Sequence, residues 1–592
     1  MLIITLNWVY IFITCFITGH AILSALSLVF GEKIKWGLLH IELSGFAFVT
    51  AYAGYFSLFH GVGAAANVVL ILICLLLLFF EREYYIKKAG ALPGFLGIRL
   101  RSCTASPLRL LWLIPFILIF LFILILSCYG SFHSDSGLYH AQSIRWIEEY
   151  GVIRGLGLLQ NRFGYNSAFF SVSALYSFAF LGQSLHGVNG YMAELVSLYA
   201  FYGIKKSLFD RSFGRLSNFA ELAPLFYMVL GGIELISPTT DPILLYLFFA
   251  IVILWIREAE GDDRTIVYTL LCIITVFLVS VKLSVGVLVL LVIQPAVSLI
   301  REKRVKEIIV SISSGVILLL PYFIRNVLIS GYLIYPFPGI DLFDLPWKIP
   351  YESARHDADE ITTWARYVRD ASRIDEKVWE WAPSWWQGQT VHDRCFSLVF
   401  IIGAVAGLVW CIISLIRQIL SREKRRLTVR MLFLESVLIA GSLFWFLSAP
   451  LIRYGYLYLL LLPLLTAGCI YNSGRTAGTA GRILSCIIPA LLIVMMLLPI
   501  GSIFYKDIVY MENNRSCQYA VFQKDYPVSP VKSREYCGSV FYFPEEPGTP
   551  VWYAAFPSVL YEENLDYIEP MGDTIKDGFR IREQNAALQR GH

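Results

Sequence analysis

Apolar runs of about 20 residues recur along most of this sequence, and they leave it few folds. A helix of about 20 residues spans the hydrocarbon core of a bilayer, and inside lipid only helices and closed barrels satisfy the backbone hydrogen bonds. The runs cover roughly residues 3–30, 37–60, 64–80, 110–129, 167–183, 188–205, 219–236, 242–256, 265–281, 284–300, 307–324, 396–416, 431–448, 454–472 and 483–505. We therefore predict an all-α polytopic membrane protein with about 13 to 15 membrane segments.

The composition agrees with a membrane protein and argues against several other classes. Charged residues make up 16% of the chain, whereas a soluble protein carries about 25%. The first apolar run lacks a basic leading region and a small-residue cleavage site, so we expect a membrane helix rather than a signal peptide. A Walker loop, a dinucleotide fingerprint and metalloprotease or zinc motifs are absent, which argues against an ATP-driven pump or a zinc protease. Nothing in the sequence resembles a nucleic-acid-binding surface.

The distribution of Lys and Arg predicts which loops face the cytoplasm. Four short loops are rich in these residues, namely residues 82–109, 205–215, 301–306 and 417–430. The N-terminus then lies on the opposite side, together with residues 130–166, 325–395 and 506–592. The predicted number of membrane crossings is inconsistent, because segments 167–183 and 188–205 cannot both cross between an outer and an inner loop. Either one of them is re-entrant, or the loop near Lys205 is an exception to the charge rule.

We expect five parts along the chain. They are N-terminal membrane helices with a basic cytoplasmic loop (1–109), a membrane module (110–324), a Trp-rich outer loop (325–395), C-terminal membrane helices (396–505) and a small extramembrane region (506–592). In the last part Val540–Phe543 and Val551–Tyr553 have the composition of short strands, which predicts an α+β or β-rich domain. Cys517 and Cys537 in this part either pair in a disulfide or stay free.

The stretch Ser131–His140 follows an apolar run and places Asp135 where a membrane helix reaches the surface, between His133 and His140. An acid at the edge of a membrane is costly and is a functional candidate by default. The alternative is a solvated loop acid. The residues that follow, Leu138–Tyr150, are amphipathic and predict a helix that lies in the interface plane.

A second acid, Asp241, begins an apolar helix at the same predicted depth and side as Asp135. Thr240, Asp241 and Pro242 also suit the first turn of any helix, so a simple cap is the alternative. Lys282 lies between two apolar segments. It could extend to the interface, hold an anionic group, or orient Asp241.

Two arginines at the outer face are candidates for binding a phosphate. Arg325 and Asn326 precede Tyr335, and Arg453 follows the turn Ala449-Pro450. The planar guanidinium offers paired donors to phosphate oxygens. The alternative for Arg453 is an anchor to lipid headgroups beside Tyr454.

The outer loop is unusually long and rich in tryptophan, which is typical of a functional loop. Its rings could pack on the membrane or stack on sugar faces; they are Trp347, Trp364, Trp379, Trp381, Trp385 and Trp386. The charged run Arg355–Glu360 in this loop is interpreted as solvated.

The order of these features resembles the GT-C class of polytopic glycosyltransferases. A membrane helix ends in an outer loop with an acid, Asp135. An amphipathic helix and the polar stretch Gln160–Asn166 lead into an aromatic helix, and Asp241 begins a later one. The nearer relatives look like protein O-mannosyltransferases, the transferase that adds aminoarabinose to lipid A, and a bacterial branch of GT-C-like proteins. The resemblance covers most of residues 110–470. The chain departs from it in having one acid in the first loop and Leu451 where the bacterial branch favours Asp.

The resemblance implies a sugar donor on a polyprenyl phosphate or pyrophosphate and an acceptor that is a glycan, lipid or protein. Asp135 would be the catalytic acid in the first loop, with His133 or His140 assisting, and Asp241 a second site acid. Cations would meet the leaving phosphate, Arg453 first, then Lys282 and Arg325. The other substrate-binding candidates are Asn326, Tyr335, Arg162 and Asn166. The metal is undetermined, with Mg²⁺ or Mn²⁺ an option. We expect the inner membrane of a bacterium, with the site facing the periplasm.

Two other functional classes remain open. A polymerase or ligase of O-antigen or another polysaccharide shares the lipid-linked donor but depends more on outer-loop arginines than on an acid. A secondary transporter would explain the helix number and membrane residues such as Glu42 and His20. Transporters usually show repeats and broken helices at mid-membrane, whereas here the polar groups gather at one face.

Overall fold

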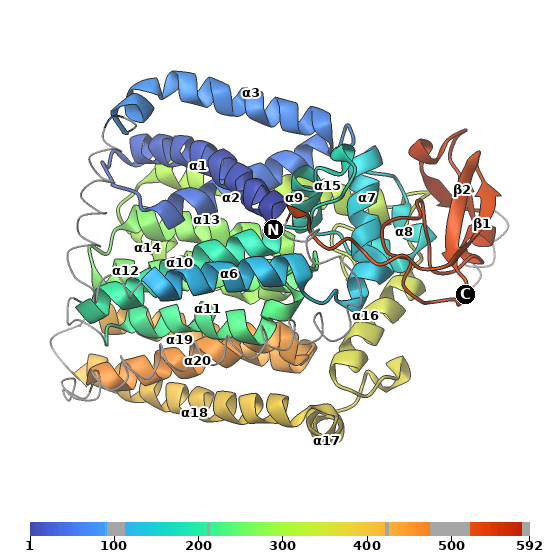
Figure 1. The fold of residues 1–592 in the computed structure, drawn as a ribbon. Helices are drawn as coiled ribbons and strands as arrows, with labels where there is room; N and C mark the ends of the chain where they lie inside the picture. Colours follow the sequence, from blue (N-terminus) through green and yellow to red (C-terminus); the bar gives the residue numbers. More distant parts are fainter. Residues whose placement is uncertain (89, 91–112, 210–213, 421–425, 474–520, 583–592) are drawn as a thin grey trace.

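The structure is a computed structural model that describes residues 1–88, 90, 113–209, 214–420, 426–473 and 521–582. Long helices lie side by side in a bundle, and short helices and strands gather at one end of it (Figure 1). The bundle helices are α1 (Leu2–Phe30), α2 (Leu38–Phe56), α3 (Ala64–Phe80), α6 (Leu113–Tyr129), α10 (Val188–Phe209), α11 (Leu216–Gly231), α12 (Thr240–Glu260), α13 (Thr265–Val281), α14 (Ile293–Arg301), α15 (Val305–Ser330), α18 (Val391–Leu420), α19 (Arg426–Ser448) and α20 (Ile452–Ser473).

Among the described residues, eight helices are long and apolar enough to cross a membrane, or up to nine if the bent pair Ala64–Phe80 and Arg82–Lys88 is one span. Leu113–Tyr129, Ala168–Leu181 and Thr265–Val281 are shorter apolar helices. The chain is thus mostly helical with the features of a multi-pass membrane protein. The finer number of 13 to 15 segments stays a prediction, and segment 483–505 lies outside the described residues.

The inconsistency in the predicted crossings involves α9 (Ala168–Tyr176). This helix has nine residues, which rise about 14 Å, whereas the hydrocarbon core is about 30 Å thick. A 3₁₀ turn follows (Ala179–Leu181), and α10 then begins with 22 residues. Segment 167–183 thus holds a shorter helix than segment 188–205, and which of the two crosses stays a prediction.

Among the described candidate spans, α12 is the one most enclosed by protein. In α12, 94% of the most apolar window is buried, whereas the corresponding values for α15 and α18 are 11% and 17%. A helix that is apolar on all sides suits either the centre of a protein or a membrane. α12 packs against α10, α11, α13 and α20, and Asp241 lies in its first turn.

The outer end holds elements from three parts of the chain. Residues 130–166 form a π-helix (Ser136–His140), α7 (Ala141–Tyr150), α8 (Leu156–Leu159) and a 3₁₀ turn (Asn161–Gly164), and the Trp-rich loop forms α16 (Tyr351–Ala365), a 3₁₀ turn (Ala371–Arg373) and α17 (Val378–Gly388). The C-terminal part contains β1 (Val531–Tyr536), β2 (Ser539–Pro544), α23 (Asn564–Tyr567), β3 (Ile568–Pro570) and β4 (Phe579–Ile581). β1 pairs with β2 and β3 with β4, both antiparallel.

The C-terminal prediction was right in one place and wrong in another. The predicted strand Val540–Phe543 lies within β2, where Lys532 faces Phe543 across the pair. The predicted strand Val551–Tyr553 is wrong, because this backbone bonds to the outer loop instead of to a strand of the C-terminal part. Cys517 lies outside the described residues, so its pairing with Cys537 stays a prediction.

The amphipathic helix exists as α7, but its polar side is partly covered by protein, since Gln142 is buried while Glu149 is exposed. The side chains of Gln142 and Arg145 donate hydrogen bonds to backbone carbonyls of residues 552–555. Its other side packs on α9, and Ile144 and Ile147 are buried there. The pattern of alternating faces therefore reflects contacts with two protein layers, and the position of α7 relative to the membrane interface stays a prediction.

The tryptophans of the outer loop differ in exposure, and Trp347 and Trp386 are half-buried. Trp381 and Trp385 are buried and pack on Phe446 with ring centroids 5.3 Å away in both cases. Trp364 and Trp379 are exposed. Trp364 and Trp379 are thus the most available to a membrane or a sugar without rearrangement of the core.

Candidate functional site

The loop after α6 is tied to the turn before α12, which brings the first two predicted acids together. The backbone N–H of Ser131 donates to the carbonyl of Ile233 at 2.8 Å, and that of His133 to Ser237 Oγ at 2.7 Å. Ser237 is itself held through its carbonyl by Asn189 Nδ2 at 2.8 Å. Two loops about a hundred residues apart in the sequence therefore form one rigid corner.

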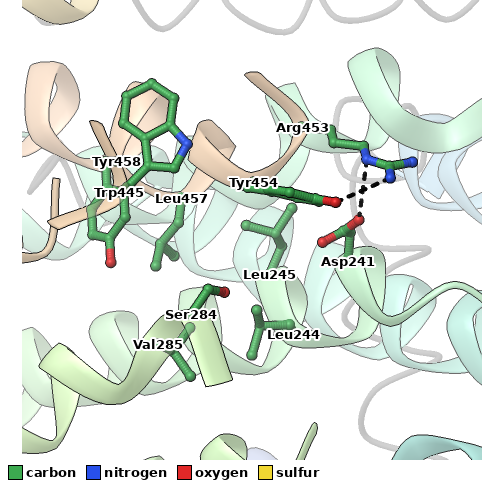
Figure 2. A pocket seen from close by; sticks show the side chains of 10 residues that line it. All are labelled: Asp241, Leu244, Leu245, Ser284, Val285, Trp445, Arg453, Tyr454, Leu457 and Tyr458. Carbon is green, nitrogen blue, oxygen red and sulfur yellow. Dashed lines mark hydrogen bonds and ion pairs between the residues drawn. The ribbon is translucent and has the colours of Figure 1, made fainter. Parts of the chain in front are cut away.

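Arg453 is positioned by the turn that begins α20. Trp385 Nε1 donates to the carbonyl of Pro450 at 2.6 Å, and Trp445 Nε1 to that of Leu451 at 3.0 Å. These bonds satisfy carbonyls just before the helix, where the backbone turns. Arg453 is the second residue of α20, and its side chain lies beside Asp241 and Tyr454 (Figure 2).

Arg453 joins both acids. Its Nη2 lies 3.1 Å from Asp135 Oδ2, and its Nε lies 3.9 Å from Asp241 Oδ2. Nη1 contacts His133 Nε2, and Nη2 also donates to the Tyr454 hydroxyl at 3.2 Å. The two predicted acids thus share one cation at the outer end of the bundle.

Lys282 completes the cluster from the end of α13. Its Nζ forms an ion pair with Asp241 Oδ1 and lies 3.7 Å from the centre of the Tyr454 ring. Lys282 therefore pairs with Asp241, as one of the options for this residue predicted. Glu234, a further acid that sequence reasoning missed, is within electrostatic range of His133 and Arg453.

The protonation of the outer loop follows from burial and from Arg453. Burial raises the pKa of the Asp135 carboxyl, but the electrostatic influence of His140, Arg453 and His133 and the hydrogen bond from Arg453 outweigh it, so the pKa lies below its ordinary value. Burial lowers the pKa of His140 to about 3, which leaves this ring neutral near pH 7. Arg453 is therefore the main permanent charge that keeps Asp135 ionised at neutral pH.

A narrow pocket opens beside the cluster. Figure 2 shows Asp241, Arg453 and Tyr454 grouped at one end and the rings of Trp445 and Tyr458 at the other. The remaining lining is mostly apolar: Leu244, Leu245, Ser284, Val285 and Leu457. Arg453 Nε is buried and has no hydrogen-bond partner among the described residues. The pocket thus joins a charged end, with a spare donor, to an apolar end.

Three other predicted site residues form a separate buried group. Arg325 Nη1 donates to Ser57 Oγ at 2.7 Å and its Nε to Asn166 Oδ1 at 3.3 Å. Asn166 Nδ2 donates to Asn326 Oδ1 at 3.0 Å. Arg325 is 3% exposed. Its side chain joins α15 to α2 and to the start of α9, an arrangement that suits packing rather than phosphate binding.

Tyr335 and Arg162 lie near a buried acid that the sequence analysis had interpreted as solvated. Tyr335 donates to Asp357 Oδ2 at 2.9 Å, and Arg162 interacts with Asp357 electrostatically. Burial raises the pKa of Asp357, while the hydrogen bonds from Tyr165 and Tyr335 oppose the rise. The interpretation of Arg355–Glu360 as a wholly solvated run was therefore wrong at Asp357, because one side of α16 packs on the loop.

Metal binding has no ready-made site in the part of the chain that the structure describes, since it contains no group of three or more His, Cys, Asp or Glu placed to hold an ion. Asp135 and Asp241 already face Arg453 and Lys282. A divalent ion would have to compete with these cations for the carboxylates. A requirement for Mg²⁺ or Mn²⁺ stays a prediction.

The residues missed by sequence reasoning are mainly those that hold the cluster. Ser237 and Asn189 fix the corner, and Tyr454 stacks beside both cations. Ser237 and Tyr454 were visible as neighbours of predicted residues. Asn189 carried no signal, since a polar residue at the start of an apolar helix is common.

Comparison with known proteins assigns a family. The family model described as "Domain of unknown function (DUF8201)" matches residues 1–460. The chain belongs to the DUF8201 family. The match includes Asp135, Asp241, Lys282 and Arg453, so the whole cluster lies within the DUF8201 region. Neither the curated proteins nor the solved structures include a match to the chain.

Proposed function

We propose that this chain is a membrane glycosyltransferase that moves a sugar from a polyprenyl phosphate or pyrophosphate to an acceptor on the non-cytoplasmic side. The observation that carries the proposal is the bridge that Arg453 makes between Asp135, at 3.1 Å, and Asp241, at 3.9 Å. The bridge lies at the charged end of a pocket whose other end is apolar. A lipid-linked sugar phosphate likewise joins a charged phosphate to an apolar lipid tail.

The acid fits the role of a base for the acceptor. An acceptor hydroxyl would give its proton to Asp135 as its oxygen forms a bond to the anomeric carbon of the sugar. The bond from that carbon to the phosphate oxygen breaks, and the electron pair leaves with the phosphate. Asp135 then releases the proton to water, which balances the reaction without an oxidant or reductant.

The cations fit the role of meeting the leaving phosphate. In the free protein the charges of Asp135 and Asp241 are balanced by Arg453 and Lys282. A phosphate must therefore compete with the carboxylates for these cations. When Arg453 turns from Asp135 toward the phosphate, burial of Asp135 is less opposed and its pKa rises. Donor binding would thus make Asp135 a stronger base at the moment when one is needed.

The test is transfer by the purified, reconstituted protein from polyprenyl-linked donors to extracted acceptors, with mass spectrometry of the lipid that copurifies. We expect a polyprenyl phosphate species to copurify and Asp135→Asn to abolish transfer. If Asp135→Asn is harmless and Arg453→Ala inactivates, a polymerase or ligase replaces the proposal. If no glycan changes while solute uptake does, a transporter replaces it.

A further inference from the structure

The C-terminal part of the chain, beyond the family match, lies on the loop that carries Asp135. Figure 1 shows the red C-terminal segment running beside α7 and α8 toward the strands. Its buried residues share one hydrophobic core with the outer loop, with Phe541 and Val559 on one side and Trp146 and Phe163 on the other. We call residues 521–560 the outer strap.

The strap holds the chain just before Asp135. Gln523 Nε2 donates to the carbonyl of Ser127 at 2.7 Å, and the backbone N–H of Lys524 donates to that of Cys128 at 3.1 Å. Both acceptors belong to the last turn of α6. Gln523 Oε1 also accepts from the backbone N–H of His186 at 3.0 Å. These bonds satisfy carbonyls that a helix end leaves without partners.

The strap also holds the chain just after Asp135. The carbonyl of Gly137 accepts from the N–H groups of Val551 at 3.0 Å and Trp552 at 3.1 Å. A Cβ at position 137 would lie 2.7 Å from Pro550 Cβ and from the Trp552 ring. Gly137 is therefore required for the close approach of the strap, two residues from the acid.

Two buried glutamines extend the contact along the loop. Gln142 Nε2 donates to the carbonyls of Trp552 at 2.7 Å and Ala555 at 2.8 Å, and its Oε1 accepts from Ser558 N–H at 3.1 Å. Gln160 Nε2 donates to the carbonyl of Leu138 at 3.2 Å, and its Oε1 accepts from Leu560 N–H at 3.2 Å. The side-chain amides of Gln142 and Gln160 thus each form hydrogen bonds through both their nitrogen and their oxygen.

The conformation of the loop explains why such support is needed. Ser136–His140 is a π-helix, a form that is rare except as short turns at functional sites. A short turn of this kind depends on bonds from outside itself to remain in one conformation. The bonds to the carbonyl of Gly137 and the side chain of Gln142 supply them.

We infer that the outer strap is a positioning element that sets Asp135 for transfer, with Gly137, Gln142 and Trp552 as its positioning residues. The inference rests on the proposed function. It implies that residues 1–460, although they hold every charged member of the cluster, do not suffice for full activity. A displacement of about 1 Å in a reacting group costs about 100-fold in rate.

A first experiment measures hydrogen exchange in the full-length protein and does not depend on activity. Gln142→Ala should speed amide exchange in residues 131–140 at least tenfold, because three hydrogen bonds to the strap are lost. The control is Arg534→Ala in β1, which pairs with Asp566 and Glu562 on the exposed side of the same domain. Equal exchange in both variants and the wild type would overturn the inference.

A second experiment uses transfer kinetics. Gly137→Ala should lower kcat about 100-fold with little change in KM for the donor, since the cations are untouched. Adding Trp552→Ala should restore part of kcat, because it removes the ring that the new Cβ would meet while the close approach to Pro550 Cβ remains. A purely structural role predicts that Gly137→Ala lowers the folded fraction while kcat per folded molecule stays unchanged, and that outcome would refute positioning. If the wild type transfers no sugar while exchange responds to Gln142→Ala, the proposed function fails and the strap still holds the loop.

Discussion

Arg453 and Arg325 both lie near the outer ends of bundle helices, yet their surroundings differ in kind. Arg453 faces Asp135 and Asp241, and its side chain is 31% exposed beside a pocket. Arg325 is 3% exposed and donates to neutral oxygens of Ser57 and Asn166. A cation among neutral acceptors fixes helices to one another. A cation held by two acids at an opening can exchange one anion for another.

The largest expected change in transfer rate follows from replacing Asp135, the acid paired with Arg453. Asp135→Asn should lower transfer about 10²- to 10⁴-fold while the folded protein persists, since the amide can still accept from Arg453. Steady-state transfer and thermal unfolding in detergent measure the two quantities. Asp359→Asn, which changes a half-buried acid near Arg355 on α16, is the matched control. Equal activities of the two variants would remove Asp135 from the mechanism.

Arg453→Gln should lower transfer about 10²- to 10³-fold and change its pH dependence. The depressed pKa of Asp135 depends on Arg453 against the opposing effect of burial. Without Arg453 the pKa rises, so Asp135 becomes protonated at a higher pH and the acidic limb of the residual rate shifts upward. An acidic limb that stays in place would mean that another group sets the ionisation of Asp135.

Replacing Arg325, by contrast, should change the stability of the protein more than its rate of sugar transfer. Arg325→Met leaves Ser57 Oγ and Asn166 Oδ1 without their donor, at a cost of about 1–3 kcal/mol for a buried polar group. Activity per folded molecule should stay within a few-fold of the wild type. Thermal unfolding and transfer assays on the monodisperse fraction measure both. Arg373→Met, at an exposed pair with Glu376, should change neither. Loss of transfer at full stability would place Arg325 in the site.

The smallest effect concerns His140. Its folded pKa of about 3 lies below its ordinary value because of burial, so the neutral ring stabilises the fold fully above about pH 6.5. This stability is lost as pH falls from there toward 3, since the unfolded chain binds a proton that the folded chain does not. His140→Gln should therefore lower the midpoint of acid unfolding and leave the pH profile of transfer near neutrality unchanged. A changed profile would show that His140 titrates in the reaction.

The sequence predicted the depth of the site residues along the membrane normal better than their position across the bundle. Hydropathy and basic loops indicate where each helix ends, so Asp135, Asp241, Lys282 and Arg453 could be assigned to one depth and side. The position of a helix across the bundle depends on packing, which hydropathy does not encode. Arg325 was therefore assigned to the correct end but to the wrong neighbours.

The contacts of the outer loop and the C-terminal part could not be predicted either, because they join residues far apart in the sequence. The pattern of Leu138–Tyr150 predicted a helix but not what covers its polar side, because a buried amide such as Gln142 has the same sequence signal as an exposed one. The strand-like composition of Val551–Tyr553 did not reveal that Trp552 lies in a turn with a φ of 57°. The partner of this segment, Gly137, lies more than 400 residues away in the sequence. Contacts of that separation leave no local pattern.

The enclosed position of α12 has a consequence for biosynthesis. The ribosome delivers Asp241 to the membrane 41 residues before Lys282 and long before Arg453. The nascent chain therefore carries an acid at the lipid boundary whose counterions have not yet been made. Asp241 gains its second counterion, Arg453, only when α20 packs against the helices that precede it. We therefore expect chains in which α20 fails to insert to be recognised as incompletely folded.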